Sequence, residues 1–254
     1  MRAVSLGSGS KGNCTLISSA STSILIDAGF GVRDTESRLA KHQVSPDSIQ
    51  AIFVTHEHGD HAQGAGRLQR AWNVPVYASH GTATGARLEQ FSPLRDGQPL
   101  RVGDIEVTPV LVPHDAREPT QFVFQSGEIL IGICTDLGSV SPHVVRQFQD
   151  LDGLLLEANY DPQMLAQGPY PPKLKARVGG DHGHLSNQQG LALLQQLLSP
   201  RLKTLVACHL SEKNNTPAHV QSLWAPHVPQ GTTFHIASQT DGCAWIDLTE
   251  LAHG

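Results

Sequence analysis

The chain lacks several features that would define its class at once. Its four cysteines, Cys14, Cys134, Cys208 and Cys243, lie far apart and form no Cys-x-x-Cys pair. This spacing argues against a disulfide framework or a cysteine-rich zinc site and predicts reduced, buried thiols. Only 16% of the residues are charged, with 18 Lys and Arg against 23 Asp and Glu. The resulting net charge of −5 argues against a globally basic nucleic-acid binder, although it does not exclude a nuclease with a local basic patch.

Long apolar segments are also missing. No apolar run approaches the ~18 residues of a membrane span, and the first residues, MRAVSLG, lack the apolar stretch of a signal peptide. We therefore expect a cytoplasmic protein with no membrane partner. The hydrophobic content of 39% is still enough for a core, and a length of 254 residues suits one large domain. We expect residues 1–254 to form that single domain.

Short apolar, β-branched runs alternate with segments of helical periodicity, which favours an α/β fold of two sheets with helices outside. Strands are expected at Cys14–Ser18, Ile24–Asp27, Ala51–Thr55, Val76–Ser79, Ile105–Val112, Gln121–Gln125, Ile129–Thr135, Gly153–Glu157, Thr204–Leu210, Thr233–Ala237 and Cys243–Leu248. Helices are expected at Arg33–His42, Gly64–Trp72, Thr82–Gln90, Pro142–Phe148, Asn187–Leu198 and Pro217–Trp224. Ser186 or Asn187 can cap the helix that follows them. The irregular, Gly- and Pro-containing stretch 159–183 is interpreted as a surface loop.

Histidine, in contrast, is abundant, with 14 residues in the chain. The strongest motif is T-H-E-H-G-D-H at positions 55–61, directly after the apolar run 51–54. It places His56, His58, Asp60 and His61 on one turn. Imidazole and carboxylate groups are ligands for zinc and also for manganese and iron. Two histidines two positions apart can face one metal, and the next Asp-His pair can reach a second metal nearby.

This H-x-H-x-D-H pattern after a strand resembles the metallo-β-lactamase-fold hydrolases. The resemblance implies a four-layer αβ/βα sandwich of two mixed sheets with flanking helices, and a site for two divalent ions, Zn or Mn, with Fe also compatible. It implies that His114, Asp136 and His209, each close to the end of an apolar run, complete the ligand set. Asp27 would then orient a ligand histidine from below the metal loop.

Further motifs narrow the resemblance. They are SGSKGN at 8–13, EANYD at 157–161, GPYP at 168–171, GHLSN at 183–187, and HLS followed by NNTP within 209–217. Together they resemble the YycJ/WalJ/VicX-like family across nearly the whole chain. That resemblance implies a two-metal phosphodiesterase, specifically a DNA exonuclease of 5′-to-3′ polarity. A DNA end is the expected partner, and RNA is compatible with the same residues.

The same residues are compatible with phosphodiester hydrolysis. Paired metals can activate a water molecule and stabilise phosphate oxygens, with Asp60 and Asp136 holding them. His184 is the expected acid for the leaving oxygen and Glu157 the carboxylate that orients its ring, by analogy with tRNA 3′-processing enzymes. The expected substrate contacts are Ser10, Asn13, Lys173, Lys175, Arg177 and Lys213. For each of these, a turn-forming or merely solvated role is an equal alternative.

Two other functions remain open from the sequence. A small-molecule hydrolase, such as a thioesterase or lactonase, could use the same metals. A non-catalytic metal-binding regulator could also be built on this scaffold, because a fold by itself does not define a substrate.

Overall fold

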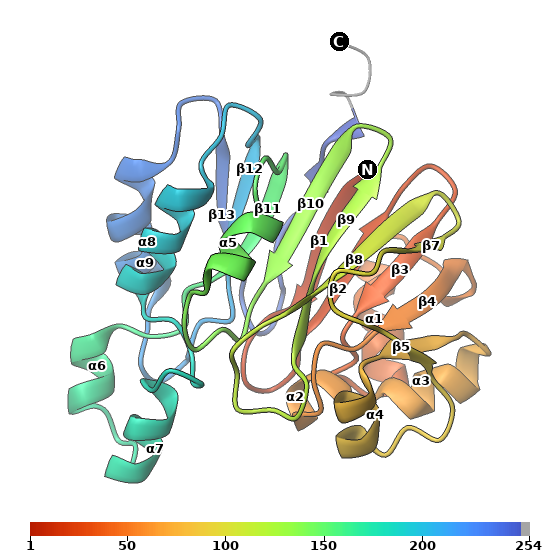
Figure 1. Ribbon diagram of the computed structural model, residues 1–254, viewed down its shortest axis with the longest axis horizontal. Coiled ribbons are helices and arrows are strands. Elements are labelled where there is room, and N and C mark those ends of the chain that lie inside the picture. The colour runs from red at the N-terminus through yellow and green to blue at the C-terminus, as the bar shows by residue number, and fades with distance from the viewer. Residues whose placement is uncertain (250–254) are drawn as a thin grey trace.

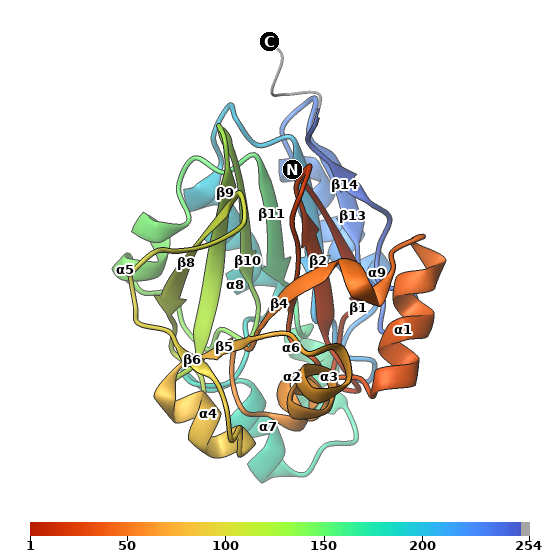
Figure 2. The ribbon, with the colours of Figure 1, turned by 90° about the vertical axis from the view of Figure 1, so that its right-hand side faces the viewer.

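Two seven-stranded sheets pack face to face, and helices cover the outer side of each (Figures 1 and 2). The computed structural model describes residues 1–249. Both sheets contain parallel and antiparallel pairs. The predicted α/β class and the four-layer αβ/βα sandwich are therefore confirmed.

The first sheet has the strand order β14-β1-β2-β3-β4-β5-β6. Its strands are β1 Arg2–Gly7, β2 Cys14–Ser18, β3 Ser23–Ile26, β4 Ile49–Phe53, β5 Val76–Ala78, β6 Ser92–Pro93 and β14 Ile246–Asp247. Strands β14 to β3 pair antiparallel, and strands β3 to β6 pair parallel. The carboxyl ends of β3, β4 and β5 consequently lie at one edge of the sheet.

The second sheet has the strand order β13-β12-β11-β10-β9-β8-β7. Its strands are β7 Leu100–Val102, β8 Ile105–Leu111, β9 Thr120–Ser126, β10 Ile129–Cys134, β11 Gly153–Glu157, β12 Thr204–Cys208 and β13 Thr233–Ile236. Strands β10 to β13 are parallel, whereas β7, β8, β9 and β10 pair antiparallel in succession. Because β8 and β10 are both antiparallel to β9, the carboxyl ends of β8, β10, β11 and β12 lie at the same edge.

Helices of the amino-terminal half cover the first sheet, and those of the carboxyl-terminal half cover the second (Figure 1). The first group is α1 Val32–Lys41, α2 Gly59–Ala62, α3 Ala65–Trp72 and α4 His80–Ala86, with the short 3-10 helix η1 Pro46–Ser48. The second group is α5 Pro142–Gln147, α6 Pro162–Gln167, α7 Pro172–Val178, α8 Asn187–Leu197 and α9 Pro217–Trp224, with η2 Ala225–His227. Ser186 caps α8 through a capping box with Gln189, as its position before the helix predicts.

The period-two alternation of the strands distributes their side chains between two cores. In β4, Ala51 and Phe53 face the other sheet, whereas Ile52 faces the helices. In β11, Leu155 faces the first sheet, whereas Leu154 and Leu156 face the helices. Strands buried on both faces need continuous apolar runs, which is why these strands were visible in the sequence.

Three sequence predictions need correction. The stretch 159–183 is not a plain loop, because it contains α6 and α7; Asp161 caps α6 through its side chain, and a proline begins each helix. The helix predicted at Thr82–Gln90 is α4, which ends at Ala86 because the backbone of the next residue, Arg87, is in the left-handed conformation. Strands β1, β6 and β7 were not predicted; β6 and β7 have only two and three residues, too few for a periodic pattern.

All four cysteines are free, and all but the partly exposed Cys243 are buried, as expected.

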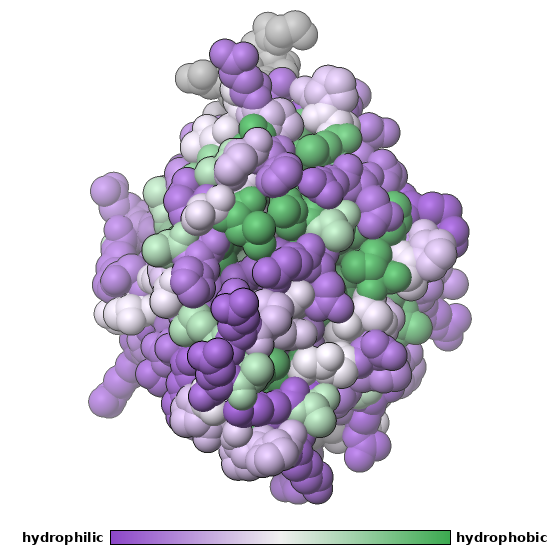
Figure 3. Space-filling model, turned by 90° about the vertical axis from the view of Figure 1, so that its left-hand side faces the viewer, coloured by the Kyte–Doolittle hydropathy of each residue, from purple (hydrophilic) through white to green (hydrophobic). Residues whose placement is uncertain are grey.

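The surface beside the second group of helices is mainly hydrophilic. Figure 3 shows hydrophobic side chains gathered only in small areas among hydrophilic ones on this face. Within residues 1–249, no helix combines the length and the hydropathy needed to cross a bilayer.

Candidate active site

The candidate site lies where the carboxyl ends of both sheets meet. Asp27 follows β3, Asp136 follows β10 and His209 follows β12, and each adopts a left-handed backbone conformation, with φ of 64°, 54° and 56°. This conformation costs an L-residue about 1–2 kcal/mol, although Asp and His tolerate it better than most. Strain of this kind concentrates at functional sites, and here it bends the chain sharply at three strand ends.

His56, His58 and His114 form one cluster of ring nitrogens. His56 Nε2 lies 3.0 Å from His58 Nδ1, and His114 Nε2 lies 3.4 Å from the same atom. His114 donates its Nδ1–H to the carbonyl of Gly183 over 2.9 Å, which leaves Nε2 as the lone-pair atom facing the cluster. His56 and His114 are buried. These three imidazole nitrogens lie within 4.8 Å of one another, which is close enough for them to bind one cation together.

Asp60, His61 and His209 form a second cluster beside the first. His61 Nε2 lies 3.4 Å from Asp60 Oδ2 and 3.3 Å from Asp136 Oδ2, and His209 Nε2 lies 3.7 Å from Asp60 Oδ2. Asp136 Oδ1 is also 4.0 Å from His114 Nε2, so Asp136 contacts both clusters. The structure thus brings together all seven residues that were predicted as metal ligands.

Asp27 lies beneath the second cluster. Its Oδ2 accepts a hydrogen bond from His61 Nδ1 at 2.7 Å, and its Oδ1 accepts from the Thr55 backbone N–H at 2.8 Å. The Thr55 hydroxyl contacts the same carboxylate and the His56 ring. Because Nδ1 donates to Asp27, the other ring nitrogen of His61, Nε2, faces Asp60 and Asp136 and is the atom that a metal ion would take in place of its proton.

Glu157 is fully buried between two histidines. Its Oε1 lies 2.8 Å from His184 Nδ1 and 3.3 Å from His209 Nδ1. Its Oε2 accepts the backbone N–H groups of Leu137 and Leu185. Burial raises the pKa of Glu157, but His184 and His209 lower it by more, so the carboxyl group's pKa lies well below its ordinary value. Asn159, which sequence reasoning missed, contacts the His209 ring and carbonyl.

The buried charges are balanced by protonated imidazoles. Burial lowers the pKa of His61 and His209, but the Asp136 carboxylate and its neighbours raise both above the ordinary value, that of His209 to about 10. Burial raises the pKa of Asp60, whereas hydrogen bonds with His209 and His61 lower it by more, so its net shift is downward. Asp136 Oδ2 and His209 Nε2 are buried without any hydrogen-bond partner among the described residues. A carboxylate oxygen and an imidazole nitrogen are both ligands for divalent cations, so bound cations would supply the partners that these two buried atoms lack.

A cavity of about 350 Å³ opens above these clusters. Ser10, Arg177 and His184 line it, but Arg177 is paired with Asp115, a residue that sequence reasoning missed although it directly follows His114. Asn13 is buried below the metal loop, where its amide contacts Asp60 and His61.

The other predicted substrate contacts lie further from the clusters. Lys213 lies 5.7 Å from the ring centre of Tyr170, which lines the cavity. The Lys175 ammonium donates to the Ala166 carbonyl, and Lys173 is exposed on α7. Neither of these two lysines is among the described residues that line the cavity.

Comparison with known proteins identifies the superfamily. Residues 22–209 match the family model described as the beta-lactamase superfamily domain. Exodeoxyribonuclease WalJ of Streptococcus pneumoniae serotype 2 is 33% identical over 219 residues, covering 83% of this chain and 81% of that protein. Exodeoxyribonuclease YycJ of Bacillus anthracis is 31% identical over 217 residues, covering 83% and 82%. The chain belongs to the metallo-β-lactamase superfamily and, within it, to the family of these WalJ and YycJ proteins.

Solved structures agree on the fold. The metallo-β-lactamase fold protein YhfI from Bacillus subtilis superposes with a TM-score of 0.75 at 18% identity, over 97% of this chain and 99% of that one. The predicted family, the predicted fold and the predicted class of metal-dependent hydrolase are confirmed by these comparisons.

Proposed function

We propose that the protein is a binuclear metal-dependent phosphodiesterase that removes nucleotides from DNA ends, with 5′-to-3′ polarity. The relatives that share most of its length are named exodeoxyribonucleases. Both sheets supply residues to one site, so we also propose that they act as one domain. The single observation that carries the chemistry is that the three-histidine cluster and the Asp60–His61–His209 cluster lie side by side, with Asp136 next to both.

His56, His58 and His114 would hold one cation, and Asp60, His61 and His209 the other, with Asp136 contacting both. Zinc and manganese suit these ligands, and iron is compatible. When bound, such a pair lowers the pKa of a water molecule and stabilises phosphate oxygens.

The remaining residues position the substrate and supply a proton. His184 lines the cavity, and its Nδ1 is engaged by Glu157, which leaves Nε2 to meet a bound substrate. Protonated at that atom, His184 would donate to the departing 3′-oxygen, because an alkoxide is a poor leaving group. Ser10 lies on the cavity wall, where its hydroxyl can contact a phosphate oxygen.

The test is metal analysis together with hydrolysis of end-labelled DNA. We expect bound divalent metal, and degradation that is blocked when the 5′ end carries a bulky group but not when the 3′ end does. His58→Ala should lose metal and activity together, and the exposed residue His219 provides the control variant His219→Ala. Metal-loaded protein that hydrolyses thioesters or lactones but no phosphodiester would refute the proposal, as would loaded protein without any turnover.

A further inference from the structure

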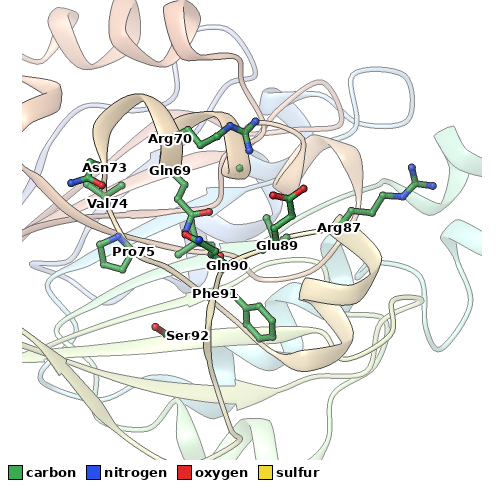
Figure 4. A pocket seen from close by; sticks show the side chains of 13 residues that line it. Gln69, Arg70, Asn73, Val74, Pro75, Arg87, Glu89, Gln90, Phe91 and Ser92 are labelled. Atoms are coloured by element: carbon green, nitrogen blue, oxygen red, sulfur yellow. The ribbon is translucent and has the colours of Figure 1, made fainter.

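A second cavity lies on the amino-terminal half of the molecule, between α3, the start of β5 and the segment that follows α4 (Figure 4). Its volume is about 830 Å³, within the roughly 300–1,000 Å³ of typical ligand sites. The residues that line it include Arg70 and Arg87 and the amide residues Gln69, Asn73 and Gln90. None of the proposed catalytic or metal-binding residues lines this cavity.

A third hollow shares lining residues with both the large cavity and the candidate active site. This smaller hollow of about 340 Å³ shares Arg70 and Arg87 with the large cavity and adds Arg67. At its other end it shares Gly59, on the metal loop, with the catalytic cavity. A ligand could therefore extend from the metal clusters along these three arginines, which we call the arginine path (Arg67, Arg70 and Arg87).

The arginine path is positively charged although the whole chain is acidic. All three arginines are exposed, and none forms an ion pair with a carboxylate of residues 1–249. Glu57 borders the path, but it lies against Arg117, whose backbone N–H donates to Oε1 at 2.9 Å and whose Nε lies 3.9 Å away. Glu89 lies between Arg70 and Arg87 in Figure 4 and is the one acidic group of the described residues that lines the large cavity.

The backbone conformation at Arg87 does not require an arginine. Arg87 ends α4 in the left-handed region, at φ 55° and ψ 44°. This position favours glycine, which adopts the conformation without strain. The Arg87 side chain has no ion-pair partner among the described residues. No carboxylate of that part of the chain therefore neutralises its charge.

The far wall of the cavity supplies an aromatic ring. Phe91 lines the cavity and is partly exposed (Figure 4). Guanidinium groups that track a phosphate backbone, together with an aromatic face for a base, are the chemistry that binds single-stranded nucleic acid. We propose that the arginine path binds the backbone of the single-stranded DNA whose end occupies the metal site. This inference rests on the proposed function for its ligand.

Direct binding tests the path without relying on catalysis. The metal-loaded protein is titrated with a fluorescent single strand of about 12 nucleotides whose linkages are hydrolysis-resistant phosphorothioates. We expect Arg70→Gln/Arg87→Gln to weaken binding about tenfold or more, and to make the slope of log K against log salt shallower by about 1.4, which corresponds to two lost phosphate contacts. The control Arg33→Gln/Arg146→Gln removes the same charge from exposed helix positions elsewhere and should change neither quantity.

Two further measurements separate binding from folding and from catalysis. Arg87→Gly removes the side chain and relieves the backbone, so it should keep or raise Tm and still weaken binding. Turnover of a small aryl phosphodiester, which is too short to reach the path, should be unchanged in all these variants. Unchanged affinity and salt slope in Arg70→Gln/Arg87→Gln would overturn the inference, as would tighter binding of an acidic peptide at the same arginines. If the wild type binds the strand through these arginines but cleaves no phosphodiester, the path is supported and the proposed function fails.

Discussion

The carboxylate of Glu157 holds the ring of His184, with Oε1 of Glu157 2.8 Å from Nδ1 of His184. The two residues are 27 positions apart in the chain, and Glu157 is fully buried. Because Oε2 is engaged by two backbone N–H groups, the carboxylate cannot rotate away. The ring of a residue at the cavity wall is therefore oriented by a group that substrate does not touch.

Glu157→Gln should lower kcat on DNA by about 10–100-fold, the usual effect of removing a carboxylate that orients a functional histidine. The glutamine keeps the volume and one carbonyl oxygen for the backbone N–H groups, but it loses the charge facing His184. Glu157 also lies 3.3 Å from His209 Nδ1, so kcat is compared at saturating metal, with the metal content checked by elemental analysis. Wild-type kcat in this variant would contradict the positioning role.

The loss of kcat caused by His184→Ala should depend on the leaving group of the substrate. With DNA we expect a loss of about 10²–10⁴-fold in kcat, the range for general acid catalysis. With an aryl phosphodiester bearing a nitrophenolate, which leaves without a proton, the loss should be much smaller. Equal losses on the two substrates at full metal content would argue against proton donation by His184.

Asp27→Asn should weaken metal binding by about 10–100-fold through the tautomer of His61. Asparagine tolerates the left-handed backbone as aspartate does, so the substitution changes the charge and the acceptor without adding strain. Chelator competition measures the affinity. Asp47→Asn, at an exposed position in η1, is the control and should bind metal normally.

Gly29→Ala should destabilise the metal loop. A Cβ at Gly29 would overlap the Asp60 carbonyl, which the Asn13 backbone N–H also approaches to 2.7 Å. We expect a loss of about 1–3 kcal/mol in the free energy of unfolding, seen as a lower Tm, together with weaker metal binding. Gly31→Ala, where a Cβ meets no atom within 4 Å, should leave both unchanged.

Metal binding should release protons. The pKa of His209 in the metal-free site is raised to about 10, so near neutral pH a cation must displace its proton before using the ring nitrogen. Affinity should consequently fall as the pH is lowered. Calorimetry in buffers of different ionisation enthalpy measures the protons released; none released at pH 7 would mean that His209 is not a ligand.

The raised pKa also sets a pH dependence for the stability of the metal-free protein. The folded pKa of His209 lies above the ordinary value of 6.5. This group therefore contributes stability that is fully present below pH ~6.5 and is lost as the pH rises toward about 10. Thermal unfolding of chelator-treated protein should show a falling Tm over this range, and the metal-loaded protein should not show the same fall.

The sequence alone was enough to predict the fold class and to name the seven residues that the structure brings together. His56, His58, Asp60 and His61 are neighbours in the chain, and local spacing after an apolar strand was enough to predict them as a metal loop. The resemblance to the metallo-β-lactamase-fold hydrolases supplied His114, Asp136 and His209, and their positions close to the ends of strand runs supported them, because the carboxyl ends of those strands share one edge. Doubly buried strands need continuous apolar runs, and such runs are visible in a sequence.

Only the tertiary structure decided which side chains from distant segments of the chain meet. It showed that His61 is the histidine that Asp27 contacts, set Arg177 against Asp115, and put Asn13 below the metal loop. It also formed two helices within a stretch whose glycines and prolines predicted a loop. These contacts join residues that are far apart in the chain, so they depend on how the layers pack. The left-handed turns at Asp27, Asp136 and His209 are stable only because that packing outweighs their local cost.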